Sequence, residues 1–252
     1  MMTVRELRKE KRARQSSLEV GGQYDPSRIL LVPVETDVQR RAARMIVENH
    51  HSYRPKFTCQ GRRIDILVYG GERVIGCIGF SDQGTVLLPY AYRRWIGLYT
   101  LRELVVGVQY SLNNYRFTMI ERNLGGKVLS LATKLLPRFW LERHGMVVCS
   151  VMTLVKPPWE GVVYKSAGWS MLGWTGGDAN FHYTDRSGGE VQTQSVFSEK
   201  LRMFGRWMPD WDRGKFLRLV TSTLKERENH AEVPEVRTVV RERIERQVTL
   251  DC

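Results

Sequence analysis

The sequence has few of the features that mark secreted, membrane or zinc-binding proteins. Its four cysteines, at positions 59, 77, 149 and 252, form no C-x-x-C pair, so neither a zinc ribbon nor a disulfide framework is indicated. No apolar run approaches the roughly 20 residues that cross a bilayer, and none follows the basic N-terminus. A full dinucleotide fingerprint and a Lys-Ser/Thr phosphate loop are also missing. We expect a soluble, cytoplasmic protein with free thiols and no membrane partner.

What the sequence has instead is positive charge. Its 252 residues include 39 Lys and Arg against 27 Asp and Glu, a net charge of +12. A field of this sign attracts phosphate backbones, so a polyanionic partner such as DNA is favoured. The hydrophobic content of 42% argues against wholesale disorder. We expect one core domain, residues 25–195, between a basic arm, 1–24, and a helical extension, 196–252.

The arm concentrates part of this charge. Such a run is either a solvated tail or an arm that contacts nucleic acid, and both readings stay open. Its cations are Arg5, Arg8, Lys9, Lys11, Arg12 and Arg14.

The apolar periodicities predict an α+β fold with a largely antiparallel sheet flanked by helices. Gly70-Gly71-Glu72 indicates a hairpin between two strands. A helix capped by Thr36 or Asp37 and a capping box at Thr100 are also expected. The predicted strands are 29–34, 64–69, 73–80, 115–120, 146–154 and 169–174, and the predicted helices include 100–112, 128–140, 197–220 and 235–248, with a linker over 222–232.

One segment of this pattern suits the binding of an anion. A strand over 115–120 feeds the turn Asn123-Leu124-Gly125-Gly126-Lys127 and then a helix, which leaves backbone N–H groups pointing outward. The glycines let an anion approach the backbone, and Lys127 adds a positive charge. A Gly-Gly helix start is also common as a plain turn. With the second strand and the Tyr164 helix that follow, this order matches the acyl-donor half of an acetyltransferase-like (GNAT-like) fold.

Several motifs resemble the DruA family of the Druantia anti-phage system and, more distantly, the Mom-type phage proteins that modify adenine in DNA. The likeness covers roughly residues 45–185. It is carried by NHHSYRP (49–55), RWIG (94–97), NNYRF (113–117), the run from Asn123 to Trp140, and YKSAGW (164–169) followed by Leu172-Gly173.

The Mom resemblance implies an acetyltransferase-like fold that transfers a small group from an acyl-CoA-type donor to the exocyclic amine of adenine. Tyr164 would match the family's tyrosine before the Trp. The chain departs from the Mom pattern in two places. It has Thr153-Leu154-Val155-Lys156 where that family ends a strand with an acidic residue, and Leu124 and Gly125-Gly126 where the family has Glu and Ser.

Tyr164 is therefore the first catalytic candidate, because a phenol can protonate a departing thiolate. The alternative is a core tyrosine with a satisfied hydroxyl. His50 and His51, at the end of a helix, could act as a general base or, with Tyr53, as metal ligands. They could equally be surface histidines without a function, and the spacing identifies no third metal ligand.

Arg93, Arg94 and Trp95, expected in a loop after Tyr90 and Tyr92, interleave cations and aromatics. Such a loop can clamp phosphates and stack on a displaced base, which a base modifier requires. Trp95 could equally fill the core. The stripe Val236, Val240, Ile244 and Val248 within 235–248 could meet a second copy or a partner helix of a defence system.

Taken together, these features predict a DNA-associated acyltransferase-like protein that modifies an adenine amine with a group from acetyl-CoA or a related donor, in phage–host conflict. The alternative is a non-catalytic nucleic-acid-binding subunit of an anti-phage defence system.

Overall fold

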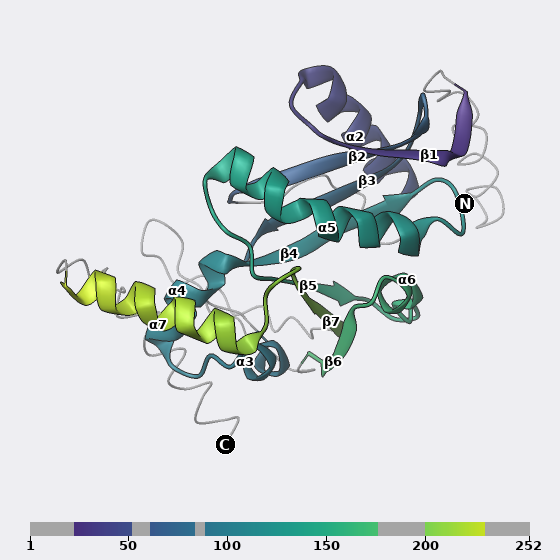
Figure 1. Ribbon diagram of the computed structural model, residues 1–252. Coiled ribbons are helices and arrows are strands. Elements are labelled where there is room, and N and C mark those ends of the chain that lie inside the picture. The colour runs from purple at the N-terminus through teal and green to yellow at the C-terminus, as the bar shows by residue number, and fades with distance from the viewer. Residues whose placement is uncertain (1–22, 52–60, 84–88, 176–199, 230–252) are drawn as a thin grey trace, which may run out of the picture. The chain divides into compact units, whose positions relative to one another are not determined.

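The computed structural model describes residues 23–51, 61–83, 89–175 and 200–229 (Figure 1). The chain divides into two compact units. Unit 1 is formed by residues up to Asp82 together with Asn113–Val148, and unit 2 by Gln83–Leu112 together with the residues from Cys149 onward.

Unit 1 is built on strands in the order β1-β2-β3-β4, of which β1, β2 and β3 pair antiparallel. The register of the first three strands pairs Leu31 with Val68, Asp65 with Gly79 and Leu67 with Cys77. Gly71, at φ 67°, makes the tight turn between β2 and β3, as the Gly-Gly-Glu motif predicted. The strands are β1 (Tyr24–Pro33), β2 (Arg63–Gly71), β3 (Arg73–Asp82) and β4 (Ser111–Met119).

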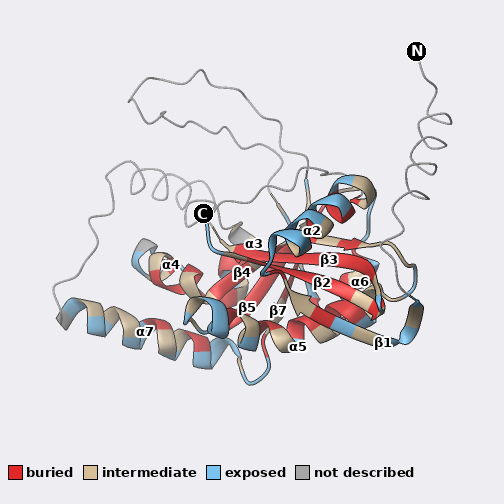
Figure 2. Cartoon of the chain, turned by 90° about the horizontal axis from the view of Figure 1, so that it is seen from above, coloured by how far each residue is buried: buried red, intermediate tan, exposed pale blue. Residues whose placement is uncertain are grey.

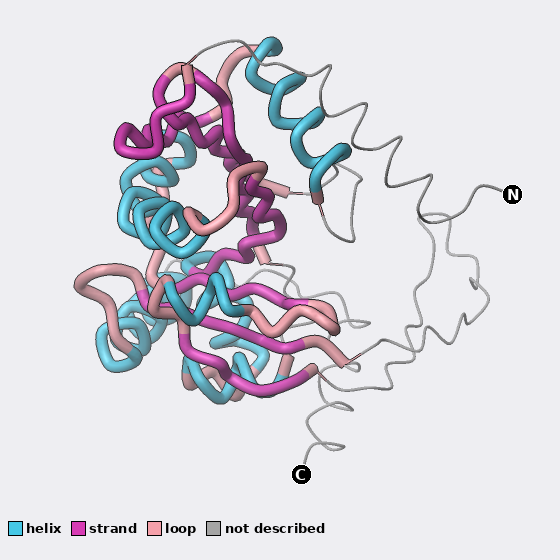
Figure 3. The backbone as a smooth tube through the Cα atoms, turned by 90° about the vertical axis from the view of Figure 1, so that its right-hand side faces the viewer, coloured by secondary structure: helices cyan, strands magenta, loops and turns pink. Residues whose placement is uncertain are grey.

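Two helices cover opposite faces of these strands (Figures 2 and 3). The helix α2 (Asp37–His50) begins at Thr36, whose side chain and that of Gln39 form a complete capping box. It packs Ala43, Ile46 and Val47 against Leu67 and Cys77. On the other face, α5 (Gly125–His144) runs for 20 residues and ends at Gly145, which adopts φ 66°.

Unit 2 contains three antiparallel strands in the order β5-β7-β6. The strand β7 (Arg202–Trp207) lies between β5 (Ser150–Val155) and β6 (Ser170–Trp174) and pairs with both. Two short helices in this unit are α3 (Tyr90–Ile96) and α6 (Val162–Ser166). A third, α4 (Leu101–Gly107), opens with the predicted Thr100–Glu103 capping box.

The core of unit 2 lies between α3, α4 and α7 (Arg213–Asn229). Tyr92, Ile96, Leu98 and Phe216 are fully buried there. Full burial of a Leu, Ile or Phe side chain stabilises a fold by about 1.5–3 kcal/mol. Outside the core, the Tyr110 hydroxyl lies 3.0 Å from Thr223 Oγ1 and helps to hold α7.

The described elements confirm the predicted class, an α+β fold with antiparallel strands flanked by helices. Several element predictions are wrong. The helix predicted over 100–112 ends at Gly107, continues as the 3-10 turn η2 (Val108–Tyr110), and gives way to β4 at Ser111. Gly107 lies so close to its neighbours that an added Cβ would come within 2.2 Å of Leu98 Cδ1.

The helix predicted over 197–220 is replaced by β7 over residues 202–207, and α7 begins only at Arg213. The strand 169–174 is therefore not the last one. Because β7 is central in its unit, Met203, Phe204 and Gly205 are buried in succession, and the period-2 alternation typical of a half-exposed strand is lost.

The linker predicted over 222–232 is helical as far as Asn229. Its polar residues are the outer face of α7 and the side chains that tie this helix to α4 and η2. Arg227 donates to Gln109 Oε1 at 3.1 Å, and Arg102 contacts Glu228 at 2.5 Å. The polar stretch after residue 222 therefore continues α7, and its charged side chains have partners in neighbouring elements. The strand predicted over 146–154 also starts later, at Ser150.

Candidate functional site

The glycine turn lies where the sequence predicted it, between β4 and α5 in unit 1 (Figure 1). Asn123 adopts φ 68°, which is uncommon outside glycine. Leu124 is the N-cap, and its side chain makes no capping bond. The first helical backbone bond runs from Val128 N to Leu124 O, 2.9 Å. The N–H groups of the three residues between them therefore point out of the helix end.

The environment of this helix end is positive. Arg122, Asn123 and Lys127 are exposed. The first turn contains no acidic residue, and the nearby Glu121 faces Arg73 at 3.5 Å. The helix dipole adds a partial positive charge at the same place. This combination of outward N–H groups, a lysine and a 20-residue helix suits the pyrophosphate of a donor such as acyl-CoA.

Tyr164 lies on α6 in unit 2, on the helix after β5 as predicted. Its side chain is 8% exposed. The ring contacts Trp169 edge-on at 5.1 Å and stacks on Phe204 at 5.7 Å between centroids. Thr153 Oγ1 lies 3.5 Å from the phenol oxygen, at the long limit of a hydrogen bond. Tyr164 thus has both a packed ring and a hydroxyl with a polar neighbour in its unit.

Gly161 brings α6 into this position. It is the N-cap of α6 with φ 69°, and an added Cβ would lie 2.4 Å from Phe204 Cε2. The missing side chain therefore lets the start of α6 approach the ring on which Tyr164 stacks.

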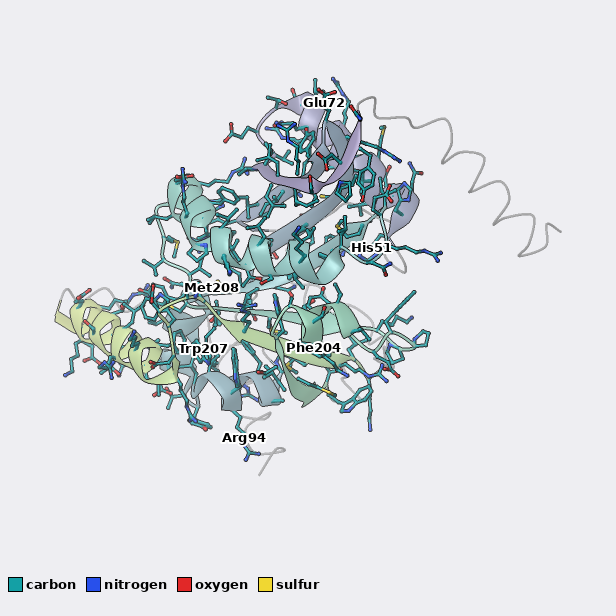
Figure 4. All side chains as sticks on the ribbon, turned by 45° about the vertical axis from the view of Figure 1, so that its right-hand side comes forward. His51, Glu72, Arg94, Phe204, Trp207 and Met208 are labelled. Atoms are coloured by element: carbon teal, nitrogen blue, oxygen red, sulfur yellow. The ribbon has the colours of Figure 1, made fainter. Side chains whose placement is uncertain are left out.

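The histidines occupy the end of α2 in unit 1. His50 is its last residue and is half-buried, whereas His51 is the C-cap and is 9% exposed (Figure 4). Tyr53, the third member of this predicted group, lies outside the described residues. Within the ranges that the structure describes, no group of three or more His, Cys, Asp or Glu side chains could hold a metal ion.

The segment Arg93-Arg94-Trp95 is helical, so the prediction of a loop is wrong. Trp95 packs into the unit 2 core, 5.5 Å from Tyr92 and 4.7 Å from Trp207 between ring centroids. This is the core-filling role that the sequence left open. Arg93 is 6% exposed, whereas Arg94 is exposed and points outward (Figure 4). Pro89 directly precedes α3 as its N-cap, a position where proline is compatible with a helix start.

The other predicted nucleic-acid contacts, Arg8, Lys9, Lys11 and Arg12, lie outside the described residues, as does the stripe within 235–248. Their roles stay predictions.

One buried polar cluster in unit 1 was missed by sequence reasoning. Asp65 is 5% exposed and accepts a short hydrogen bond from the Tyr115 hydroxyl. Its second oxygen lies 3.5 Å from Arg63 Nε. Burial raises the pKa of the Asp65 carboxyl above its ordinary value, although Tyr115 and Arg63 act in the opposite direction. Such a perturbed carboxyl is a candidate for a functional group.

Gly79 makes this contact possible. It pairs with Asp65 across β2 and β3, and a Cβ there would lie 2.6 Å from the Tyr115 ring. The ring of Tyr115 therefore reaches from β4 across the glycine of β3 to the carboxyl on β2. The sequence does hold a signal, since Asp65 interrupts an otherwise apolar strand, but its partner depends on the strand register.

Comparison with known proteins gives matches only among solved structures. No protein-family model and no curated protein matches the chain. The solved structures include an N-acyl amino acid synthase from uncultured soil microbes, with 15% identity, a TM-score of 0.41, and coverage of 73% of this chain and 93% of that one. An aminoglycoside 6'-N-acetyltransferase from Enterococcus faecium has 8% identity, a TM-score of 0.41, and coverage of 73% and 99%.

A third similar structure is a ribosomal-protein-S5-alanine acetyltransferase from Vibrio fischeri, with 9% identity, a TM-score of 0.38, and coverage of 77% and 99%. Separately, no helix in the described part of the chain has the length and apolar character needed to span a bilayer.

Proposed function

We propose that this chain is a DNA-associated acyltransferase-like enzyme. It transfers a small group from an acyl-CoA-type donor to a nucleobase amine, that of adenine, in phage–host conflict. The observation that carries the proposal is the start of α5, where three outward N–H groups follow Asn123 at positive φ and no side chain caps the helix. The resemblance to DruA and Mom-type proteins and the net charge of +12 support DNA as the acceptor.

Acyl-CoA supplies a thioester carbonyl carbon, and its sulfur leaves as a thiolate. The chain's own groups have two tasks in this reaction. The N–H groups of Gly125, Gly126 and Lys127 bind and orient the anionic part of the donor. The Tyr164 hydroxyl donates a proton to the departing sulfur. In balance, a C–N bond forms, the C–S bond breaks, the amine loses one proton and the thiolate gains one.

Donor binding is tested by calorimetry with acetyl-CoA and two matched variants. Gly126→Asp places a carboxylate where the pyrophosphate would bind, and Gly126→Asn adds a side chain of similar size without the charge. Asp is favourable in the first turn of a helix, so folding is preserved. We expect the wild type to bind, the Asn variant to bind more weakly, and the Asp variant to lose binding.

Two results would contradict the proposal. A wild type that releases no heat of binding excludes the acyl donor before the variants matter. Equal losses in the Asn and Asp variants would mean that bulk, rather than negative charge, disrupts the turn.

One observation favours the alternative of a non-catalytic nucleic-acid-binding subunit. The strand end where Mom-type proteins have an acidic residue reads Thr153-Leu154-Val155-Lys156 in this chain, and Thr153, the side chain beside Tyr164, is 2% exposed. A threonine cannot take a proton from an amine at neutral pH. This alternative predicts DNA binding with no modified nucleoside in cells that express the protein.

A further inference from the structure

Two large aromatic side chains are exposed on one side of unit 2. Trp174 ends the edge strand β6 and is 45% exposed, and Trp159, before α6, is 53% exposed. A single arginine joins them. Arg202 pairs with Trp174 in the β6–β7 ladder, and its guanidinium carbon lies 4.6 Å from the centroid of the Trp174 ring. Its Nη1 also donates to the carbonyl of Trp159 at 2.6 Å.

This arrangement fixes the Trp174 ring in advance of any partner. The cation holds one face of the indole, and the hydrogen bond to the Trp159 carbonyl holds the cation. A ring held in this way loses little conformational freedom when something stacks on it. Exposed indoles are also costly in water, so an exposed indole that is held in place indicates a surface with a partner.

The charges around the pair select the class of partner. Lys200 is exposed and precedes β7 by two residues, and Lys165 is exposed on α6. Among the described residues, Glu160, directly after Trp159, is an acidic neighbour. Arg202 adds a positive charge against one face of the Trp174 ring. Single-stranded nucleic acid offers the matching groups, because its bases stack on aromatic rings and its phosphates meet cations.

We propose that the surface formed by Trp159, Trp174 and Arg202, the Trp174 surface, binds single-stranded DNA by stacking an unpaired base on the exposed indole of Trp174. This inference rests on DNA being the substrate in the proposed function and adds the place where an unpaired strand docks. A base must leave its duplex before its pairing edge can be modified.

The test is fluorescence anisotropy with a labelled oligothymidylate of about 12 nucleotides and a blunt duplex of the same length. Four full-length proteins are compared: the wild type, Trp174→Ala, Trp174→Phe and Tyr99→Ala. Tyr99 is the matched control, because it is 52% exposed in the same unit and its hydroxyl accepts a hydrogen bond from Arg213 at 3.3 Å. Thermal melting of each variant checks that it is folded.

We expect Trp174→Ala to weaken binding to the single strand about tenfold or more, the scale of one stacked base. Trp174→Phe and Tyr99→Ala should keep most of the affinity. Duplex binding and the salt slope of single-strand binding should be unchanged in Trp174→Ala, since stacking releases no counterions.

Three results would overturn the inference. The first is an unchanged affinity of Trp174→Ala for the single strand, and the second is an equal loss of affinity for the duplex and the single strand. The third is a self-association of the wild type that Trp174→Ala abolishes, which would assign the surface to a second copy of the chain. These outcomes are separate from the donor test. A chain that binds the single strand through Trp174 but binds no acetyl-CoA keeps this inference and loses the transfer function. A chain that binds acetyl-CoA but does not bind the single strand through Trp174 would contradict this inference alone.

Discussion

Asp65 is a buried carboxyl whose environment changes its ionisation, and this has a measurable consequence for stability. Burial raises the pKa of this carboxyl above its ordinary value of 3.8. The folded chain therefore binds its proton more tightly than the unfolded chain does. The contribution of this group is fully present below pH 3.8 and is lost as the pH rises through the raised pKa.

We therefore expect Asp65→Asn to remove this pH dependence. Asn keeps the size of the side chain and can still accept from the Tyr115 hydroxyl, but it does not ionise. Urea unfolding between about pH 4 and pH 8 measures the difference. The variant should gain stability relative to the wild type as the pH rises. A difference between the two proteins that stays constant across this range would show that burial does not control the carboxyl.

At this scale the sequence predicted single residues better than contacts. The place of Tyr164 on a helix after β5 followed from local periodicity and was confirmed. The contact between Asp65 and Tyr115 was not predictable, because it joins residues 50 positions apart and needs glycine at position 79 to let the ring cross β3. The periodicity of the sequence predicts which face of a strand a side chain occupies, whereas the strand register determines which residue it contacts.

At the scale of elements, the start of α6 combines a left-handed backbone with close packing. We expect Gly161→Ala to destabilise the protein by about 2 kcal/mol or more, because it combines a left-handed backbone with a clash against Phe204. Gly145→Ala is the control, since Gly145 has φ 66° with nothing within 4 Å of an added Cβ.

The control should lose only about 1 kcal/mol, the cost of the backbone conformation alone. Urea unfolding followed by circular dichroism gives both values. Equal losses for the two variants would show that the contact with Phe204 does not limit the approach of α6.

Elements with a local signal were predictable and those that depend on pairing were not. The N-cap at Thr36, the capping box at Thr100 and the hairpin turn at Gly71 are encoded within a few residues, and all were predicted. The strand β7 is defined by two neighbours, β5 and β6, that are distant in sequence, so its buried run was mistaken for part of a helix.

For the whole molecule, charge is the property with the clearest test. We expect removal of residues 1–20 to weaken DNA binding and to reduce the slope of log K against log salt, by about one unit for each phosphate that the arm neutralises. Anisotropy over a range of salt concentrations measures it. A variant with the arm's residues shuffled should keep the slope, because it keeps the charge.

An unchanged slope in the truncated protein would mean that the arm is only a solvated tail. The bulk composition predicted a basic protein with a polyanionic partner, but it did not locate the surface that binds this partner. The aromatic and cationic groups of the Trp174 surface come together only through the β6–β7 pairing.

The most direct test of the central claim is mass spectrometry of nucleosides from the DNA of cells that express the wild type or Tyr164→Phe. The Phe ring keeps the contacts with Trp169 and Phe204 and removes only the hydroxyl. We predict a new adenine-derived nucleoside with the wild type, reduced by about 10²-fold or more in the variant. If cells that accumulate the wild-type protein contain no modified nucleoside in their DNA, the transferase function is contradicted. The alternative of a non-catalytic nucleic-acid-binding subunit then stands.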